Sequence, residues 1–446
     1  MNIDELKLIM KENGIVGAGG AGFPSYAKLD KRADTIILNC AECEPLLKLH
    51  RQVLEKYAYE IIITLDQIAQ IVEADEVIIA IKPSYKAAVA QVEGVIKMVT
   101  TSRKIRIGLL PEVYPAGDEV VTIYETTGKV VPPGSIPISI GVTVFNVETI
   151  LNVYRALNEK EPVIYKYITI TGEVKNPVTL KVPLGITVDE CIKAAGGLTI
   201  EDPVYINGGP MTGRIVSGYD TITKTSNAIL VMPSNQYIVR KRQSKISVDM
   251  KRAMASCCQC QMCTDLCPRN LLGHPIRPHA FMRAATSGST KEVNTFMDTF
   301  YCSQCGLCEM YSCFQELSPK TLIGQCKDSL RKNGVVPPKE VNQKEVSSSR
   351  QYRGVSKERL TARLGLEKYD AKAPLIEELV ETEIVKISMR QHIGAPATPC
   401  VTKGDKIERG TMIGSVSAES LGACIHASMS GTVLDVNNDY VTIRKG

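Results

Sequence analysis

Residues 257–268 read CCQCQMCTDLCP, and four of the five cysteines in this stretch follow the spacing C-x2-C-x2-C-x3-C-P. Residues 302–313 read CSQCGLCEMYSC and repeat the C-x2-C-x2-C triplet. Three thiolates at this spacing can reach three corners of one iron–sulfur cubane, while the fourth ligand must come from elsewhere in the chain. The two stretches therefore predict two [4Fe–4S] clusters.

We expect each triplet to receive its fourth cysteine from the other stretch, because clusters with this motif pair exchange ligands in that way. One cluster would take Cys257, Cys260, Cys263 and Cys313, and the other Cys302, Cys305, Cys308 and Cys267. Structural zinc is the alternative, but zinc sites usually combine CxxC pairs or Cys/His sets, which explains these triplets poorly. Cys258 has the wrong spacing to Cys260 for a ligand, so we expect a spare packed thiol.

A glycine-rich loop lies near the start of the chain, where residues 14–24 read GIVGAGGAGFP. It contains a formal G-x-G-x-x-G with Glu42 twenty residues after the last glycine, as in a dinucleotide-binding fingerprint. That fingerprint must follow a strand, whereas the apolar residues of segment 3–10 are spaced like one face of a helix. We therefore expect a loop that brings backbone N–H groups close to a phosphate or a flat ring; a tight interdomain turn is the alternative.

The chain divides into four domains and a linker by its patterns. Residues 1–162 alternate apolar strand-like runs with helical segments, which predicts an α/β domain with a largely parallel sheet. Residues 163–244 predict a small β-rich domain, and residues 245–333 a helical cysteine-rich one. A Pro- and Ser-containing stretch, 334–383, indicates a linker, and short β-runs with many glycines predict an all-β module at 384–446. The fold class is multidomain α/β.

Composition excludes several classes of protein. The 446 residues carry a net charge of only +5 with interspersed signs, so we expect no nucleic-acid partner. No run of about 18 uncharged apolar residues predicts membrane insertion, and the acidic start does not resemble a secretory signal. We expect a cytoplasmic protein, where a reducing environment keeps thiols free for metals.

Four further motifs carry a family resemblance: GAGGAGFP at 17–24 with Lys28, NCAECEP at 39–45, YPAGDE at 114–119 and NVET at 146–149. In this order they resemble the flavoprotein subunit of respiratory complex I and the C subunit of the Rnf complex. The resemblance implies bound FMN, with NADH as electron donor. It implies flavin contacts from Gly17, Gly19, Ala21, Lys28, Asn39, Glu42, Gly117, Glu119, Asn146 and Thr149, and it implies that Phe23 and Glu44 face the nicotinamide nucleotide. Ala18 stands where complex I usually has Arg, and the complex I cluster motif is absent.

The remaining segments resemble other modules of the same proteins. Residues 170–177 (ITGEVKNP) and 194–198 (AAGGL) are similar to the soluble-ligand-binding β-grasp domain. The spacer between the two cysteine stretches resembles that of an α-helical ferredoxin. Residues 390–396 (RQHIGAP) and 426–433 (HASMSGTV) are similar to the Rnf barrel-sandwich module, without the lysine that carries a swinging cofactor. The placement of that module after the clusters resembles the domain order of the cobalamin reductases of propanediol-utilisation microcompartments.

Together these observations predict an NADH-dependent flavin iron–sulfur oxidoreductase. A flavin can accept a hydride pair and release single electrons, and a [4Fe–4S] cluster carries one electron. The resemblance implies cobalamin as acceptor, a corrinoid adenosyltransferase as partner, and a location in the cytoplasm or within a bacterial microcompartment. The alternatives are an electron-input subunit of an Rnf-like membrane complex or of another reductase such as proline reductase, and a non-catalytic scaffold with zinc. No side chain is assigned as a catalytic acid or base.

The other cysteines and histidines carry no recognisable ligand spacing. Cys40 and Cys43 form a CxxC pair between acidic residues, which disfavours thiolate, so we expect them to be packed rather than redox-active. We expect structural roles for the isolated cysteines and for all five histidines. These are Cys191, Cys326, Cys400 and Cys424, and His50, His274, His279, His392 and His426.

Overall fold

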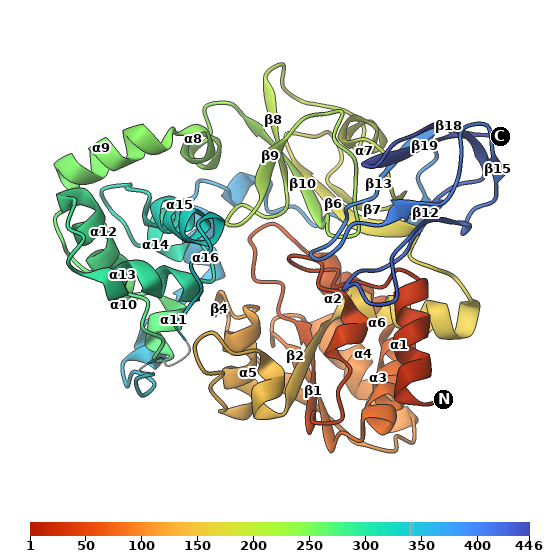
Figure 1. The fold of residues 1–446 in the computed structure, drawn as a ribbon, viewed down its shortest axis with the longest axis horizontal. Coiled ribbons are helices and arrows are strands. Elements are labelled where there is room, and N and C mark those ends of the chain that lie inside the picture. Colours follow the sequence, from red (N-terminus) through yellow and green to blue (C-terminus); the bar gives the residue numbers. More distant parts are fainter. Residues whose placement is uncertain (339–340, 342) are drawn as a thin grey trace.

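The computed structural model describes residues 1–338, 341 and 343–446. The protein has four parts, which are arranged around the middle of the molecule (Figure 1). They are the N-terminal domain (1–162), the β-rich domain (163–244), the cysteine-rich domain (245–333) and the C-terminal module (384–446). Over these described ranges, none of the helices has both the length and the apolar character needed to cross a lipid bilayer.

The N-terminal domain is built on a four-stranded parallel sheet, as the alternating pattern predicts. In sheet order its strands are β3 (Lys104–Leu109), β2 (Glu76–Ile81), β1 (Thr35–Cys40) and β5 (Val142–Asn146). Its helices are α1 (Ile3–Glu12), α2 (Leu49–Lys56), α3 (Ala58–Val72), α4 (Lys86–Met98), α5 (Glu119–Thr127) and α6 (Val147–Tyr154). Helix α1 precedes the glycine-rich loop, so the loop does not follow a strand, as the spacing in segment 3–10 predicts.

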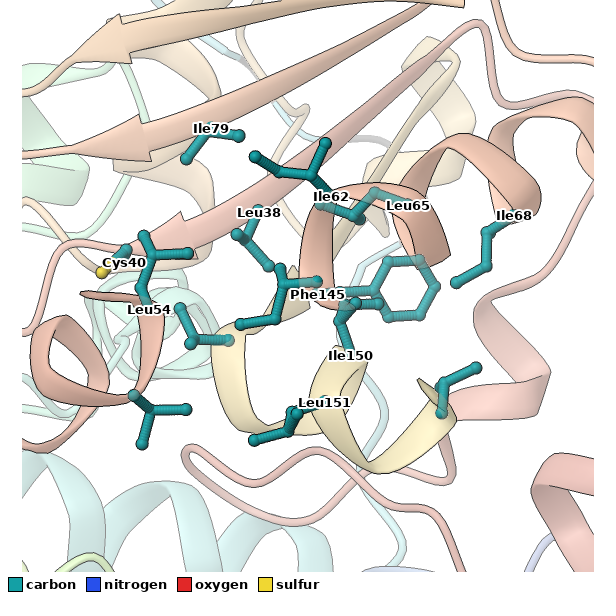
Figure 2. Packing of buried hydrophobic residues seen from close by; sticks show 14 of the residues in the cluster. Leu38, Cys40, Leu54, Ile62, Leu65, Ile68, Ile79, Phe145, Ile150 and Leu151 are labelled. Atoms are coloured by element: carbon teal, nitrogen blue, oxygen red, sulfur yellow. The ribbon is translucent and has the colours of Figure 1, made fainter. Parts of the chain in front are cut away.

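The core of this domain lies between the sheet and helices α2, α3 and α6. Figure 2 shows Leu38, Ile79 and Phe145 from the strands packed beside Ile62 and Leu65 of α3. All of these side chains except Phe145 are fully buried, and Phe145 is 2% exposed. Because parallel strands end at one edge of their sheet, the core fixes the ends of β1 and β5, where predicted flavin residues follow.

The β-rich domain contains a six-stranded mixed sheet against which helix α7 (Val188–Ala194) packs. In sheet order the strands are β12 (Leu375–Leu379), β7 (Val178–Pro183), β6 (Tyr165–Gly172), β10 (Ala228–Pro233), β8 (Pro203–Asn207) and β9 (Arg214–Val216). Thr187 caps α7 through a reciprocal capping box with Glu190, which fixes where the helix begins. The loop between β8 and β9 extends toward the N-terminal domain, where it becomes part of the site described below.

The cysteine-rich domain consists of short helices joined by the cysteine loops. They are α9 (Ile246–Ser256), α10 (Met262–Asp265), α11 (Pro268–Leu271), α12 (Pro278–Ser287), α13 (Val293–Met297), α14 (Leu307–Met310) and α15 (Pro319–Lys332). Helix α8 (Tyr237–Gln243) connects it to the β-rich domain. Phe281, Leu322 and Ile323 form a small core with Tyr301. The backbone at Gln259, Gln261 and Gln304 has positive φ, which turns the cysteine loops back on themselves.

The segment 334–383 is more structured than the linker that its Pro and Ser content predicts. Residues 339, 340 and 342 of that segment lie outside the described residues. Within it, residues 355–379 form a strap across two domains: β11 (Val355–Ser356) pairs with β4 (Val113–Tyr114), α16 (Lys357–Arg363) follows, and β12 joins the β-rich sheet. The linker interpretation is wrong for this part, because Leu360, Leu364 and Leu366 are buried in a core shared with three domains.

The C-terminal module is all β, as predicted, and contains two small sheets. Its strands are β13 (Ile384–Ser388), β14 (Thr398–Pro399), β15 (Lys406–Ile407), β16 (Met412–Ser415), β17 (Ile425–His426), β18 (Gly431–Val436) and β19 (Tyr440–Lys445). Buried Val385, Ile413, Val433 and Ile443 close the space between the sheets. The module lies against helix α1, far from it in sequence (Figure 1).

We expect the strap to contribute directly to stability. The change Leu360→Ala removes a fully buried side chain and should lower the free energy of unfolding by about 2–5 kcal/mol. Tyr352→Ala, at a side chain that is 80% exposed just before the strap, should change it by less than about 0.5 kcal/mol. Urea unfolding followed by circular dichroism measures both, and equal effects would show that the strap is a passive connection.

Candidate functional site

A cavity with a volume of about 970 Å³ lies where three domains meet. One wall comes from the N-terminal domain and the other from the β-rich domain and the C-terminal module. All twelve residues that we predicted to contact flavin or nicotinamide line this cavity: Gly17, Gly19, Ala21, Phe23, Lys28, Asn39, Glu42, Glu44, Gly117, Glu119, Asn146 and Thr149. Their individual roles remain predictions, but the structure brings them together.

The glycine-rich loop is held in place by backbone contacts at its base. The N–H of Gly17 donates to the carbonyl of Phe23 at 2.9 Å, and the N–H of Ala18 donates to Oγ1 of Thr149 at 2.9 Å. A Cβ added to Gly19 would lie 3.0 Å from Nδ2 of Asn146, the residue that caps helix α6. The loop thus lies directly against the end of β5, which leaves room for a flat ring only while glycine occupies this position.

The charged groups on the N-terminal wall are largely compensated. Lys28 forms an ion pair with Glu119 at 2.8 Å and donates to the carbonyl of Val144 at 2.8 Å. Glu42 is only 8% exposed; its Oε1 accepts from the N–H of His50, whereas its buried Oε2 has no partner among the described residues. Burial raises the pKa of Glu42. A buried acceptor without a donor in a cavity of this size fits a bound group that carries N–H or O–H donors, as a flavin does.

Glu44 joins two walls of the cavity. Its carboxylate accepts from the N–H of Met211 at 2.8 Å and from Oγ1 of Thr212 at 2.6 Å, both in the β8–β9 loop. A Cβ on Gly209 would lie 2.3 Å from Oε2 of Glu44, so this close approach requires glycine. Burial raises the pKa of Glu44. Glu44 therefore lines the cavity as an interdomain contact, in addition to the predicted nicotinamide role.

The second wall was not predicted from the sequence. It consists of the loop NGGPMTG at 207–213, with Arg214, and of residues 390–393 from the C-terminal module, together with nearby polar side chains. The glycines of this loop were the available signal, but nothing in the sequence shows that they lie opposite the first glycine-rich loop. His50 and His392, which we assigned structural roles, also line the cavity.

A buried lysine fixes the three domains around the cavity. Nζ of Lys224, in the β-rich domain, donates to the carbonyls of Gly14 at 2.7 Å and Cys424 at 2.9 Å. The backbone N–H of Ile393 donates to the carbonyl of Ala21 at 3.2 Å, so the C-terminal module also contacts the glycine-rich loop itself. Burial lowers the pKa of Lys224 to about 7.

The eight predicted cluster ligands fall into two neighbouring groups in space. Cys257, Cys260, Cys263 and Cys313 line one pocket, so the structure brings together the first predicted set despite the distance of Cys313 in sequence. The pKa of Cys263 is raised to about 12, mainly by burial and in addition by the neighbouring thiols of this set. The exposed side of the pocket is formed by Cys258 and Cys260. Cys258 is not the packed thiol that we expected, because its position before the turn at Gln259 directs it to solvent.

The second group lies beside the N-terminal domain, with Cys308 buried and its other three cysteines partly buried. Burial raises the pKa of Cys267, and the thiols of Cys305 and Cys302 raise it further, which places Cys267 with the second triplet. Burial also raises the pKa of Cys308, with contributions from Cys302, Cys305 and Cys263. A gathering of buried and partly buried thiols that disfavour each other's ionisation fits a site whose thiolates are compensated by bound iron. Within the described ranges, no three metal-ligating side chains lie close enough to share a single ion.

The second group contacts the cavity through one aromatic side chain. The hydroxyl of Tyr114 donates to the carbonyl of Cys305 at 2.5 Å, and Tyr114 packs in the same cluster as Cys43 of the cavity wall. Arg269, which follows Cys267 closely, forms a largely buried ion pair with Asp118 at 2.9 Å. Asp118 lies between the cavity residues Gly117 and Glu119. The cysteine-rich domain is therefore attached at the end of the flavin-type motif YPAGDE.

The CxxC pair is not suited to thiolate chemistry. Cys40 is fully buried, and burial raises its pKa well above the ordinary value. Burial also raises the pKa of Cys43 to about 11. The raised pKa of both thiols disfavours thiolate chemistry, as expected. Cys40 is packed, whereas Cys43 is partly buried and lines the cavity.

Full-length relatives define the family. The chain is 37% identical to cobalamin reductase PduS of Citrobacter freundii, over 97% of this chain and 95% of that protein. It is 36% identical to cobalamin reductase PduS of Salmonella typhimurium, over 100% of this chain and 98% of that protein. The chain belongs to the cobalamin reductase PduS family. The C subunit of the Na⁺-translocating ferredoxin:NAD⁺ oxidoreductase complex of Acetobacterium woodii is 30% identical over 61% of this chain and 59% of its own length.

Domain models of known families match in four places along this member of the PduS family. The Nuo51 FMN-binding domain matches residues 10–155, the SLBB domain 167–215, a 4Fe–4S dicluster domain 256–318 and the RnfC barrel sandwich hybrid domain 362–446. An NAD⁺-reducing [NiFe]-hydrogenase in the air-oxidized state shares the fold, with a TM-score of 0.50 and 17% identity, over 84% of this chain and 68% of that chain. These matches establish a flavin domain and an iron–sulfur domain in one chain.

The buried lysine predicts a defined pH dependence of stability. In the unfolded chain Lys224 has a pKa of about 10.4, against about 7 in the folded protein. Between these values the unfolded state binds more protons, so stability from this residue rises with pH. We expect the free-energy difference between wild type and Lys224→Met to increase in favour of wild type by about 1 kcal/mol per pH unit between about pH 7 and pH 10, and to stay level below pH 7.

Urea unfolding at several pH values measures this difference. Lys403→Met, at an exposed lysine of the C-terminal module, is the matched control and should show no pH-dependent difference from wild type. A pH-independent difference for Lys224→Met would contradict the buried, low-pKa ammonium.

Proposed function

We propose that this protein takes hydride pairs from NADH and delivers single electrons to cobalamin. The observation that carries the proposal is the cavity with the FMN motifs, joined through Tyr114 to a domain with two groups of four cysteines. Membership of the PduS family supports cobalamin as the acceptor. The chain spans nearly the whole length of the PduS relatives but 59% of the Rnf subunit, which favours the cobalamin reductase over a subunit of a membrane complex.

The cofactors that we propose are FMN and two [4Fe–4S] clusters. When bound, FMN supplies the exchange between two-electron and one-electron transfer, and the clusters supply one-electron transfer. The N-terminal wall would hold the flavin through the glycine-rich loop, Lys28, Asn146 and Glu42. Each cysteine group would hold one cluster, and each cluster would take its fourth ligand from the other cysteine stretch. The cluster domain would be of the α-helical ferredoxin type. Along the chain the domains would follow the order flavin, β-grasp, cluster and barrel-sandwich.

The position of the two cysteine groups gives electron transfer a direction. The group of Cys267, Cys302, Cys305 and Cys308 lies next to the flavin cavity through the Tyr114 contact. The group of Cys257, Cys260, Cys263 and Cys313 lies farther out and reaches the surface at Cys260. The proximity of Cys263 and Cys308 joins the two groups. We therefore assign the Cys305 group to the flavin side and the Cys260 group to the side where the acceptor binds.

A corrinoid adenosyltransferase is the partner that this reaction requires, because reduced cobalamin must be used before it is reoxidised. Propanediol-utilisation microcompartments are the proposed location. Both proposals rest on the resemblance and on the family of the relatives. Co-purification from cells in which microcompartments are induced tests them.

The function is tested with protein purified anaerobically, after quantification of iron, sulfide and FMN. We expect NADH to bleach the flavin absorption and cobalamin to be reduced in the same cuvette. Protein with a full complement of FMN and iron that does not reduce cobalamin with NADH would contradict the proposed acceptor.

A pair of cysteine variants tests the order of the groups. Cys267→Ser removes a ligand on the flavin side, so NADH should still reduce the flavin, while cobalamin reduction falls by at least about 10-fold, the scale of even outer-shell changes at metal sites. Cys400→Ser changes an exposed thiol of the C-terminal module, outside both groups, and should keep the wild-type iron content and rate. Equal losses in both variants, or full activity of Cys267→Ser, would contradict the assignment.

A further inference from the structure

We propose that the second wall of the cavity is a binding site for the diphosphate of a dinucleotide, formed by the β8–β9 loop, Arg214 and Arg390. The inference rests on the proposed function, since it names the part of the protein that holds the anionic portion of the electron donor. Neither the N-terminal domain nor the cysteine motifs contain this site. It combines the β-rich domain with the C-terminal module.

The charges on the two walls differ. On the N-terminal wall, Lys28 and Glu119 neutralise each other, and Glu44 accepts two hydrogen bonds from the β8–β9 loop. On the opposite wall, Arg214 and Arg390 line the cavity, and neither side chain forms an ion pair or a hydrogen bond within the part of the chain that the structure describes. Two unpaired guanidinium groups facing one cavity favour an anion, and guanidinium binds phosphate oxygens in a bidentate manner.

The β8–β9 loop is preformed. Arg242 donates from Nε to the carbonyl of Gly213 at 2.8 Å and from Nη2 to the carbonyl of Pro210 at 2.6 Å. Gly208 has a φ of +104°, which a residue with a side chain rarely adopts. Gly208, Gly209 and Gly213 all line the cavity, so the backbone can approach a ligand closely here. The N–H groups of Gly208, Met211 and Gly213 already donate to Ala228, Glu44 and Gly209, so the anion would be bound by the two arginines rather than by the loop backbone.

The cavity has room for a second ligand beside the flavin. Small-molecule pockets have volumes of about 300–1,000 Å³, and this one, at about 970 Å³, is at the upper end. The predicted flavin residues all lie on the N-terminal wall, whereas Asn227 on the opposite wall has a buried Oδ1 without a donor among the described residues. This unpaired acceptor, close in sequence to Thr223 and Thr225 on the same wall, is suited to the hydroxyl groups of a ribose.

A flavin phosphate is the other source of the same chemistry. FMN carries one phosphate, for which the glycine-rich loop is available on the N-terminal wall. A dinucleotide brings a diphosphate with more negative charge, and on that wall Lys28 is already paired with Glu119. The flavin phosphate and the dinucleotide diphosphate predict different effects of substituting Arg214 and Arg390. If they hold the flavin, their loss lowers FMN affinity; if they hold the dinucleotide, FMN affinity is unchanged.

The experiment uses the complete protein loaded with FMN and ADP-ribose as a probe that has the diphosphate but no nicotinamide. Calorimetry should show that Arg214→Gln and Arg390→Gln each weaken ADP-ribose binding about 10-fold or more, because a hydrogen bond to a charged group contributes about 1.5–3 kcal/mol. Binding of FMN to the apoprotein should remain within about 2-fold of wild type. Arg444→Gln, at an exposed arginine of the same module outside the cavity, should leave both affinities unchanged.

The outcomes separate this inference from the proposed function. Unchanged ADP-ribose affinity in both variants, no binding of ADP-ribose to wild type, or a loss of FMN affinity instead would each overturn the diphosphate site. Arginine-dependent ADP-ribose binding by a protein whose flavin is not reduced by NADH would support the site and contradict the proposed donor. Reduction by NADH with a Michaelis constant that both variants leave unchanged would support the donor and overturn the site.

Discussion

The buried ammonium of Lys224 is the contact on which the arrangement of the site depends. It lies in the β-rich domain and donates to one carbonyl before the glycine-rich loop and to one carbonyl of the C-terminal module. Burying an amine costs free energy unless its hydrogen bonds are made, so the geometry is stable only while both carbonyls are present. The cavity is thus a property of three domains held together, and none of them encloses it alone.

Local motifs could be read from the sequence because their chemistry resides in neighbouring residues. The spacing of Cys257, Cys260 and Cys263 and the motifs around Gly17 and Asn146 predicted which residues gather, and the structure places them around one pocket and one cavity. The strands of the N-terminal sheet were also predictable, since buried parallel strands are short apolar runs. The assignment of Cys313 to the first group followed from the exchange of ligands that this motif pair requires.

What the sequence did not predict depends on contacts between distant segments. Glycines at 207–213 and Arg390 have no local pattern that marks them as parts of one cavity wall, because their meeting depends on how the β-rich domain and the C-terminal module pack. The strap was missed for a different reason. The proline pair at 337–338 and the serine run at 347–349, which precede it, made the whole segment 334–383 look like a linker. The three leucines that bury the strap are spaced over one short helix and the turn that follows.

The contact between the C-terminal module and the glycine-rich loop has a consequence for biosynthesis. The loop emerges early from the ribosome, but Ile393 and Cys424, which hold it and its preceding turn, are translated much later. A nascent chain can therefore form the N-terminal sheet while the wall that closes the cavity is still missing. The cavity is complete only after the C-terminal module has been translated and has packed against the glycine-rich loop.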